Sequence, residues 1–134
     1  MTLVDTNVLL DLVTDDPQWS EWSVLQLEAA ALRGPLFVND VIYAELSVRY
    51  ERVEMLDFFL NSAGLTMLPM PRSALFLAGK AFASYRKMGG ARTGVLPDFF
   101  IGAHAAVEGL VLLTRDKARY QTYYPKVMLI APGG

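Results

Sequence analysis

Short apolar segments that alternate with longer helical patterns constrain the fold of this chain most strongly. In the longer stretches apolar residues recur at helical spacing, and glycines such as Gly34 and Gly109 end two of them. Strands that are joined by helical crossovers form a parallel sheet covered on both faces. The chain is therefore predicted to be a single α/β domain, residues 1–134, with strands at 3–4, 36–38, 65–68, 110–114 and 127–130.

The predicted helices complete this alternation. The first helix follows Asp5 and stops near Asp15, and the helix after the second strand is capped by Asn39 or Asp40. The remaining helices are predicted at residues 18–33, 53–60, 73–88 and 98–108. The glycine-rich stretch 89–94 predicts a flexible connection before the last of these helices.

The composition is unusually apolar for a globular domain. Hydrophobic residues make up 53% of the chain and the mean hydropathy is +0.29, yet no apolar run approaches the roughly 20 residues that span a bilayer. We see no secretory signal and no cysteine, which fits a cytoplasmic protein without a membrane segment. The apolar excess predicts an interface, either of a homodimer or with a partner protein.

Charge is distributed unevenly along the chain. Residues 1–60 carry eleven acids and three bases, a formal charge of −8, whereas residues 61–134 carry three acids and nine bases, a charge of +6. Many of these bases flank Asp98 and Asp116: Lys80, Arg86, Lys87, Arg92, Arg115, Lys117 and Arg119. They are either solvated helix faces or a basic rim that holds a polyanion beside an acidic centre.

Four acidic residues each lie at the edge of a different apolar segment: Asp5, Glu45, Asp98 and Asp116. Burying a carboxylate costs several kcal/mol unless a partner compensates its charge. In open parallel sheets sites form outside the carboxyl ends of the strands, and all four acids can reach that edge. Mg²⁺ or Mn²⁺ prefers such oxygen ligands. The pattern therefore predicts a metal-dependent phosphodiesterase site, in which two ions about 4 Å apart would activate water and stabilise the leaving oxygen.

Each residue also has a simpler explanation when it is taken alone. Asp5 and Asp98 stand where helix caps commonly stand, and Arg115 is equally suited to an RNA phosphate and to a local carboxylate. His104, among alanines, fits a packed core position better than a metal-ligand position, with a supporting role left open. Trp19 and Trp22 lie one turn apart and fit a core or a hydrophobic partner groove.

Four segments together strongly resemble PIN-domain ribonucleases, in particular the VapC-type toxins of prokaryotic toxin–antitoxin pairs. They are residues 3–9 (LVDTNVL), 43–46 (YAEL), 96–105 (LPDFFIGAHA) and 113–116 (LTRD), and the resemblance runs through the whole chain in order. It implies a PIN-like three-layer sandwich with a central five-stranded parallel sheet, Mg²⁺- or Mn²⁺-dependent RNA cleavage, a homodimer, and inhibition by a cognate antitoxin.

The resemblance also implies roles for individual residues. The metal-binding, catalytic acids would be Asp5, Glu45, Asp98 and Asp116, with Asp40 as the alternative to Glu45. Asn7 and Thr114 would be supporting positions, and we predict Thr6 as a third. From the charge distribution, Arg115, Lys117 and Arg92 are the predicted RNA contacts.

Three other functions share parts of this pattern. A phospho-accepting receiver domain usually has paired acids after its first strand, whereas Asp5 has no acidic neighbour. A phosphatase of the haloacid dehalogenase type needs a second Asp two residues after the first, and Asn7 stands there. A catalytically silent binding module has no need of all four acids.

Overall fold

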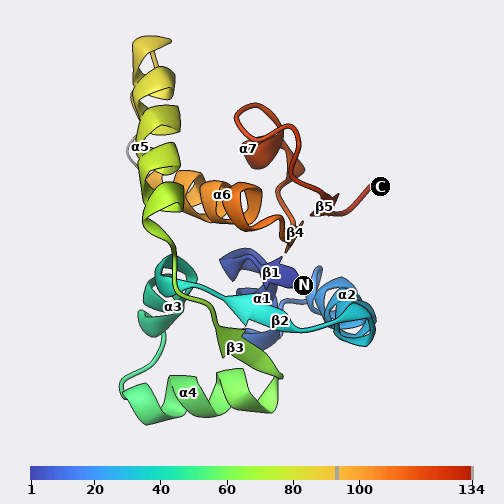
Figure 1. Ribbon diagram of the computed structural model, residues 1–134. Helices are drawn as coiled ribbons and strands as arrows, with labels where there is room; N and C mark the ends of the chain where they lie inside the picture. The colour runs from blue at the N-terminus through green and yellow to red at the C-terminus, as the bar shows by residue number, and fades with distance from the viewer. Residues whose placement is uncertain (93, 134) are drawn as a thin grey trace.

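The computed structural model describes residues 1–92 and 94–133 of the chain. Within them, five parallel strands form one sheet in the order β3-β2-β1-β4-β5 (Figure 1). The strands are β1 (Thr2–Val4), β2 (Leu36–Val38), β3 (Leu65–Met67), β4 (Val111–Leu113) and β5 (Leu129–Ile130). The predicted five-stranded parallel sheet is confirmed.

Seven helices connect the strands in the described part of the chain. They are α1 (Thr6–Val13), α2 (Ser20–Arg33), α3 (Asp40–Ser47), α4 (Val53–Ser62), α5 (Arg72–Lys87), α6 (Leu96–Glu108) and α7 (Lys117–Gln121). The chain moves outward from β1 to β3 and then returns past β1 to β4 and β5. Because such crossovers are right-handed, this reversal places α1–α4 on one face of the sheet and α5–α7 on the other.

The central strands position the edge at which the acids gather. β1 is buried along its length between β2 and β4, with Leu3 opposite both Phe37 and Leu112. The ladder continues one residue past β1, where the Asp5 N–H donates to the Leu113 carbonyl at 2.9 Å. The ends of β1 and β4 therefore deliver Asp5 and Thr114 to the same place.

A second, smaller core lies between α5, α6 and the segment after α7. Ala78, Phe99, Ala103 and Tyr124 are its buried members. α5 packs along α6, and its C-terminal part extends away from the body of the molecule (Figure 1). This core fixes the N-terminal end of α6, which carries Asp98, relative to the end of α5.

The predicted boundaries of the elements agree with the observed ones to within about two residues. α6 starts at Leu96 rather than Asp98, because Pro97 is accommodated in the first turn, where its missing N–H is not needed. The five-residue helix α7 was not predicted, since it is too short to show a hydrophobic period. No helix in residues 1–92 or 94–133 combines the length and the apolar character needed to cross a membrane.

Two helical glycines should respond oppositely to substitution by alanine. A Cβ at Gly102 would clash with the ring of Tyr124, whereas a Cβ at Gly79 meets nothing within 4 Å. We expect Gly102→Ala to lower the free energy of unfolding by about 1–3 kcal/mol through overpacking. Gly79→Ala should raise it by about 0.5–1 kcal/mol through helix propensity. Urea denaturation of both variants would test this, and equal effects would contradict the packing of Tyr124 on α6.

Candidate functional site

The structure brings the four predicted acids to the carboxyl edge of the sheet. Asp5 follows β1, Glu45 lies on α3, Asp98 lies in the first turn of α6, and Asp116 precedes α7. The charges of Asp5, Glu45 and Asp116 each raise the pKa of Asp98, so the four carboxylates are close enough to repel one another. We call these four residues the carboxylate cluster.

Asp5 is the buried anchor of the cluster, with 2% of its surface exposed. Its Oδ1 accepts the Thr6 N–H at 2.7 Å, and its Oδ2 accepts the hydroxyls of Thr114 at 2.8 Å and Tyr120 at 2.7 Å. Burial raises the pKa of Asp5, while these hydrogen bonds lower it. Because a carboxylate has about four lone-pair positions, roughly one remains for a further ligand.

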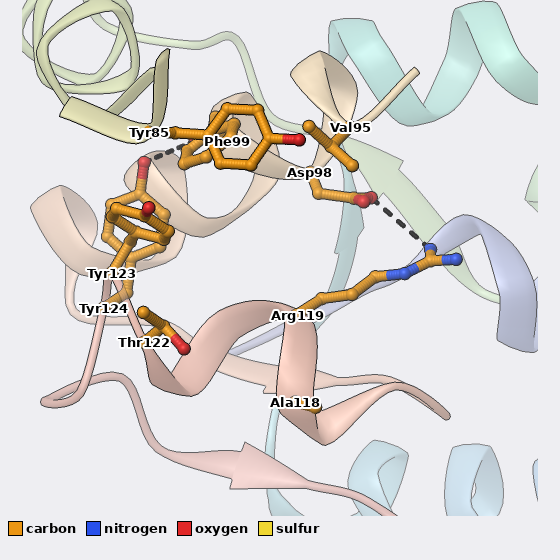
Figure 2. A pocket seen from close by; sticks show the side chains of 9 residues that line it. All are labelled: Tyr85, Val95, Asp98, Phe99, Ala118, Arg119, Thr122, Tyr123 and Tyr124. Atoms are coloured by element: carbon orange, nitrogen blue, oxygen red, sulfur yellow. Dashed lines mark hydrogen bonds and ion pairs between the residues drawn. The ribbon is translucent and has the colours of Figure 1, made fainter. Parts of the chain in front are cut away.

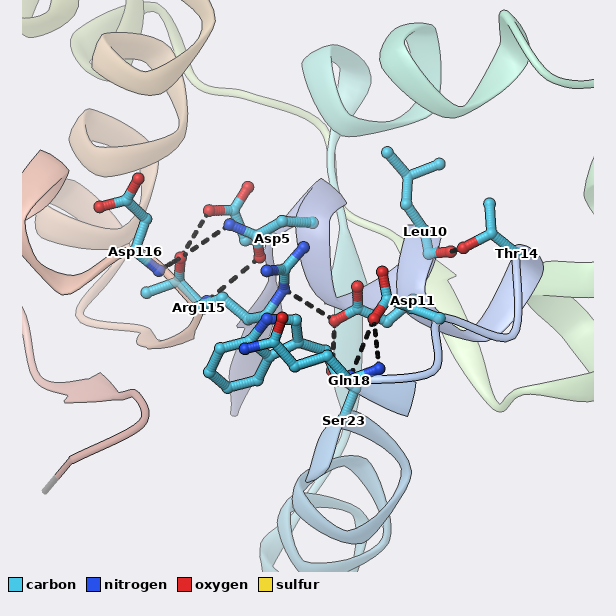
Figure 3. Close-up of polar contacts among 12 residues, drawn as sticks. Asp5, Leu10, Asp11, Thr14, Gln18, Ser23, Arg115 and Asp116 are labelled. Carbon is cyan, nitrogen blue, oxygen red and sulfur yellow. Dashed lines mark hydrogen bonds and ion pairs between the residues drawn. The ribbon is translucent and has the colours of Figure 1, made fainter. Parts of the chain in front are cut away.

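The three residues predicted to support the acids form one network. The Thr114 hydroxyl, which donates to Asp5, accepts the Asp116 N–H at 3.0 Å and the Asn7 side-chain amide at 3.4 Å. The Asn7 carbonyl oxygen accepts the Arg115 N–H at 3.2 Å. Figure 3 shows the surroundings of this network, with Asp5 beside Arg115 and Asp116 of the loop after β4. The network fixes the backbone at Asp116 relative to Asp5.

Glu45, not Asp40, is the acid of α3 that lies beside Asp5. Its Oε1 accepts the Thr6 hydroxyl at 2.6 Å, and Thr6 is the residue whose N–H binds Asp5. Burial raises the pKa of Glu45, and the charge of Asp5 raises it further. Asp40 is exposed in the first turn of α3.

Arg119 lies between the two remaining acids. Its Nη1 is 3.6 Å from Asp98 (Figure 2). Its Nε is 2.5 Å from Asp116. The side chain of Asp98 is 16% exposed, and burial together with its acidic neighbours raises its pKa to about 6, although Arg119 opposes the shift. Arg119 is thus the internal counter-ion of the cluster.

Several cluster oxygens are suited to a hard divalent cation. Among the described residues, one oxygen each of Glu45, Asp98 and Asp116 accepts no hydrogen bond from the protein. In residues 1–92 and 94–133 no three acidic or histidine side chains are arranged, as they stand, to hold a metal ion. The donor set fits Mg²⁺ or Mn²⁺ in its chemistry, and Asp98 and Asp116 would have to separate from Arg119 to provide it.

Arg115 was predicted to bind either an RNA phosphate or a local carboxylate, and in the structure it pairs with a local carboxylate. Its Nε is 2.8 Å from Oδ2 of Asp11, which is 1% exposed and also accepts the Ser23 hydroxyl (Figure 3). The guanidinium lies over the ring of Trp19, 5.1 Å from its centroid. Arg115 therefore ties the loop after β4 to α1 and α2, while Lys117 and Arg92 are exposed.

Trp19 and Trp22 are partly buried within the chain rather than presented as one apolar face. Their rings meet edge to face, with centroids 6.0 Å apart. Trp22 packs on the main core and Trp19 lies under Arg115. The structure therefore gives this pair an internal role, whereas Val24, Leu25 and Leu32 are the large apolar residues that the same helix exposes.

His104 is a buried core residue, as predicted. Its Nδ1 is 3.0 Å from the side-chain nitrogen of Asn39, whose oxygen caps α3 through the Ile42 N–H. Because the Asn39 amide donates, His104 Nδ1 accepts and its proton lies on Nε2. Burial lowers the pKa of His104, so the ring is neutral. His104 thus supports the start of α3, the helix of Glu45.

The sequence did not reveal the roles of Tyr120 and Arg119. Both lie on the unpredicted helix α7, and Tyr120 binds Asp5 across 115 positions of the chain. A buried carboxylate needs hydrogen-bond donors, so the sequence implied only that some hydroxyl group would lie beside each predicted acid. Only the fold selects Tyr120 from the six tyrosines.

Comparisons with known proteins agree with this geometry. Residues 2–123 match the family model described as PIN domain. The structure is similar to VapBC2 from Rickettsia felis bound to a promoter DNA fragment (18% identity, 97% of each chain, TM-score 0.73). It is also similar to FitAcB from Neisseria gonorrhoeae (20% identity, 97% of this chain and 96% of that one, TM-score 0.67). No curated protein matches the sequence.

The raised pKa of Asp98 predicts a pH-dependent stability. Because its folded pKa of about 6 exceeds the unfolded value of about 4, Asp98 opposes folding increasingly as the pH rises through that interval. In chelator, the free energy of unfolding of Asp98→Asn should match that of the wild type near pH 4 and exceed it by about 3 kcal/mol at pH 7. Urea denaturation across this range tests the prediction, with Glu28→Gln on the exposed face of α2 as control. A difference that does not change with pH would contradict it.

Proposed function

Since the chain belongs to the PIN domain family, we propose that it is a metal-dependent endoribonuclease and the toxin of a toxin–antitoxin pair. The observation that carries this proposal is the carboxylate cluster, four mutually repelling acids from separate connections of one parallel sheet. The match also favours a nuclease over the receiver, phosphatase and silent-module alternatives.

The four acids would hold Mg²⁺ or Mn²⁺. The bound cation would polarise a phosphate and supply a nucleophilic water at neutral pH. Asp5 is held by hydrogen bonds to three groups, so its orientation is preset. Thr114 and Asn7 set the position of Asp116, and Thr6 orients Glu45. Without a bound metal, burial and the neighbouring acids raise the pKa of Asp98 to about 6, so it can exchange a proton near neutral pH.

A polyanionic substrate agrees with the charge around the cluster. Arg119 stands beside the acids, and α5 exposes Arg86 and Lys87 in its last turn, directly after the pocket residue Tyr85 (Figure 2). Lys117 and Arg92 are exposed and remain our candidates for RNA contact. Basic residues outside an acidic centre retain the phosphates that the centre itself repels.

We further propose a cognate antitoxin, a homodimer and a cytoplasmic location. The similar structures from Rickettsia felis and Neisseria gonorrhoeae are named as the complexes VapBC2 and FitAcB, and a Klebsiella pneumoniae neighbour is named as a toxin–antitoxin complex. Exposed apolar residues such as Leu32, Val48 and Phe58 supply surface that partners would cover.

Cleavage of single-stranded RNA tests the nuclease proposal. We expect the wild type to cleave in Mn²⁺ or Mg²⁺ and to stop in excess chelator. Asp98→Asn and Glu45→Gln should each lower the rate by about a hundredfold or more, because each removes charge that would hold the cation. Glu28→Gln should cleave like the wild type. Full activity of Asp98→Asn, or cleavage in chelator, would refute the proposal, and exclusive cleavage of DNA would refute its substrate.

Arg119 should compete with the metal for Asp98 and Asp116. We expect Arg119→Gln to bind Mn²⁺ about two- to fivefold more tightly, the size expected for a half-exposed ion pair. Calorimetric titration with Mn²⁺ alone measures this without any cleavage. Lys117→Gln, which changes the charge by the same amount two residues away, is the control. Weaker binding by Arg119→Gln would mean that Arg119 arranges the acids rather than competing for them.

A further inference from the structure

An aromatic cavity opens directly beside the carboxylate cluster. It has a volume of about 150 Å³ and lies between the first turn of α6, the end of α5 and the α7 segment (Figure 2). Tyr85, Phe99 and Tyr123 form its apolar wall, and Asp98 and Arg119 also line it. The cavity therefore shares Asp98 with the cluster, and it also contacts Arg119, the counter-ion of the cluster. We call it the aromatic pocket.

We infer that the aromatic pocket binds one nucleobase of the RNA, from a nucleotide next to the bond that is cut. This inference rests on the proposed nuclease function and adds a base-recognition subsite to it. Aromatic side chains are the usual platform for unpaired bases, and each such stack contributes measurably to the affinity for single strands.

The walls of the pocket are held in place before any ligand binds. The ring centroids of Phe99 and Tyr123 are 5.0 Å apart, and those of Tyr85 and Phe99 are 5.6 Å apart. The Tyr85 ring packs against Gly90 so closely that any Cβ there would clash with it. The Tyr124 hydroxyl donates to the Phe99 carbonyl at 2.8 Å behind the wall. A base would thus meet ordered aromatic surfaces at little entropic cost.

Polar groups at the pocket give a base something to recognise. The Tyr85 hydroxyl accepts the Arg92 N–H at 3.1 Å, which leaves its own proton free to donate to a ligand. The Thr122 side chain, exposed on the opposite side, is a second donor or acceptor (Figure 2). These two hydroxyls could therefore form hydrogen bonds with the polar edge of a base in the pocket.

The charge at the opening favours a nucleotide over an apolar side chain of a partner protein. Arg119, 49% exposed, extends past the opening toward Asp98 (Figure 2). Its guanidinium can bind the phosphate attached to a base in the pocket. An apolar side chain of a partner protein would contact the aromatic wall but would offer no anionic group to the Arg119 guanidinium.

The test uses a single-stranded RNA that the wild type cleaves at one bond, and versions in which an abasic ribose replaces one nucleotide at a time. Affinity is measured by fluorescence anisotropy in chelator, and kcat/KM in Mn²⁺. We expect an abasic ribose at one position beside the bond to weaken wild-type binding about tenfold. Tyr85→Leu should bind the parent RNA about tenfold more weakly and no longer distinguish the abasic version. Tyr85→Phe keeps the aromatic ring, so it should still bind the parent RNA more tightly than the abasic version.

Phe76→Leu is the matched control, because Phe76 lies on the same helix, is 68% exposed and is outside the pocket. It should retain the abasic effect in full. Tyr123→Leu gives an independent test should Tyr85→Leu fail to fold. Cleavage that is insensitive to every abasic substitution would overturn the pocket and leave the nuclease intact. If Tyr85→Leu weakens the binding of a partner protein but not of RNA, the pocket proposal is likewise overturned and the nuclease proposal is left intact. Failure of the wild type to cleave any RNA would overturn both proposals.

Discussion

The carboxyl group of Asp5, buried at the end of the central strand, is the constraint on which the rest of the site depends. A carboxylate without partners at that depth would cost several kcal/mol. Hydroxyl groups from Thr114 and Tyr120 and the N–H of Thr6 compensate it. These donors come from α1, the end of β4 and α7, so the hydrogen bonds to this one carboxyl group fix the relative positions of three elements. The structure of the site follows from that requirement.

The remaining acids cannot be compensated in the same way, because they stand close to Asp5 and to one another. Burial and mutual repulsion raise the pKa of Asp98, and Arg119 offsets part of this cost by lying between Asp98 and Asp116. An arginine can be displaced from a half-exposed position at little cost, whereas the bonds to Asp5 are buried. The cluster therefore combines a permanent anchor with a counter-ion that a metal ion can replace.

The sequence was sufficient for every part of the site that depends on strand ends. Asp5 and Asp116 follow apolar strands, and parallel strands deliver such residues to one edge, so the convergence of the acids was predictable. The choice between Glu45 and Asp40 was not, because it depends on a side-chain contact with Thr6. An ion pair was one of the two roles predicted for Arg115, but its partner was not predictable, since Asp11 is distant in the chain and is one of eleven acids in the first 60 residues.

The short helix α7 explains why chemistry and recognition are joined in this molecule. Its residues donate to Asp5 through Tyr120, neutralise Asp98 and Asp116 through Arg119, and bound the aromatic pocket through Arg119 and the residues that follow. Under the proposed function, a phosphate bound to Arg119 would draw this side chain from the acids and leave them to a cation, while the attached base would enter the pocket. Substrate binding and completion of the metal site would then be the same movement of one side chain.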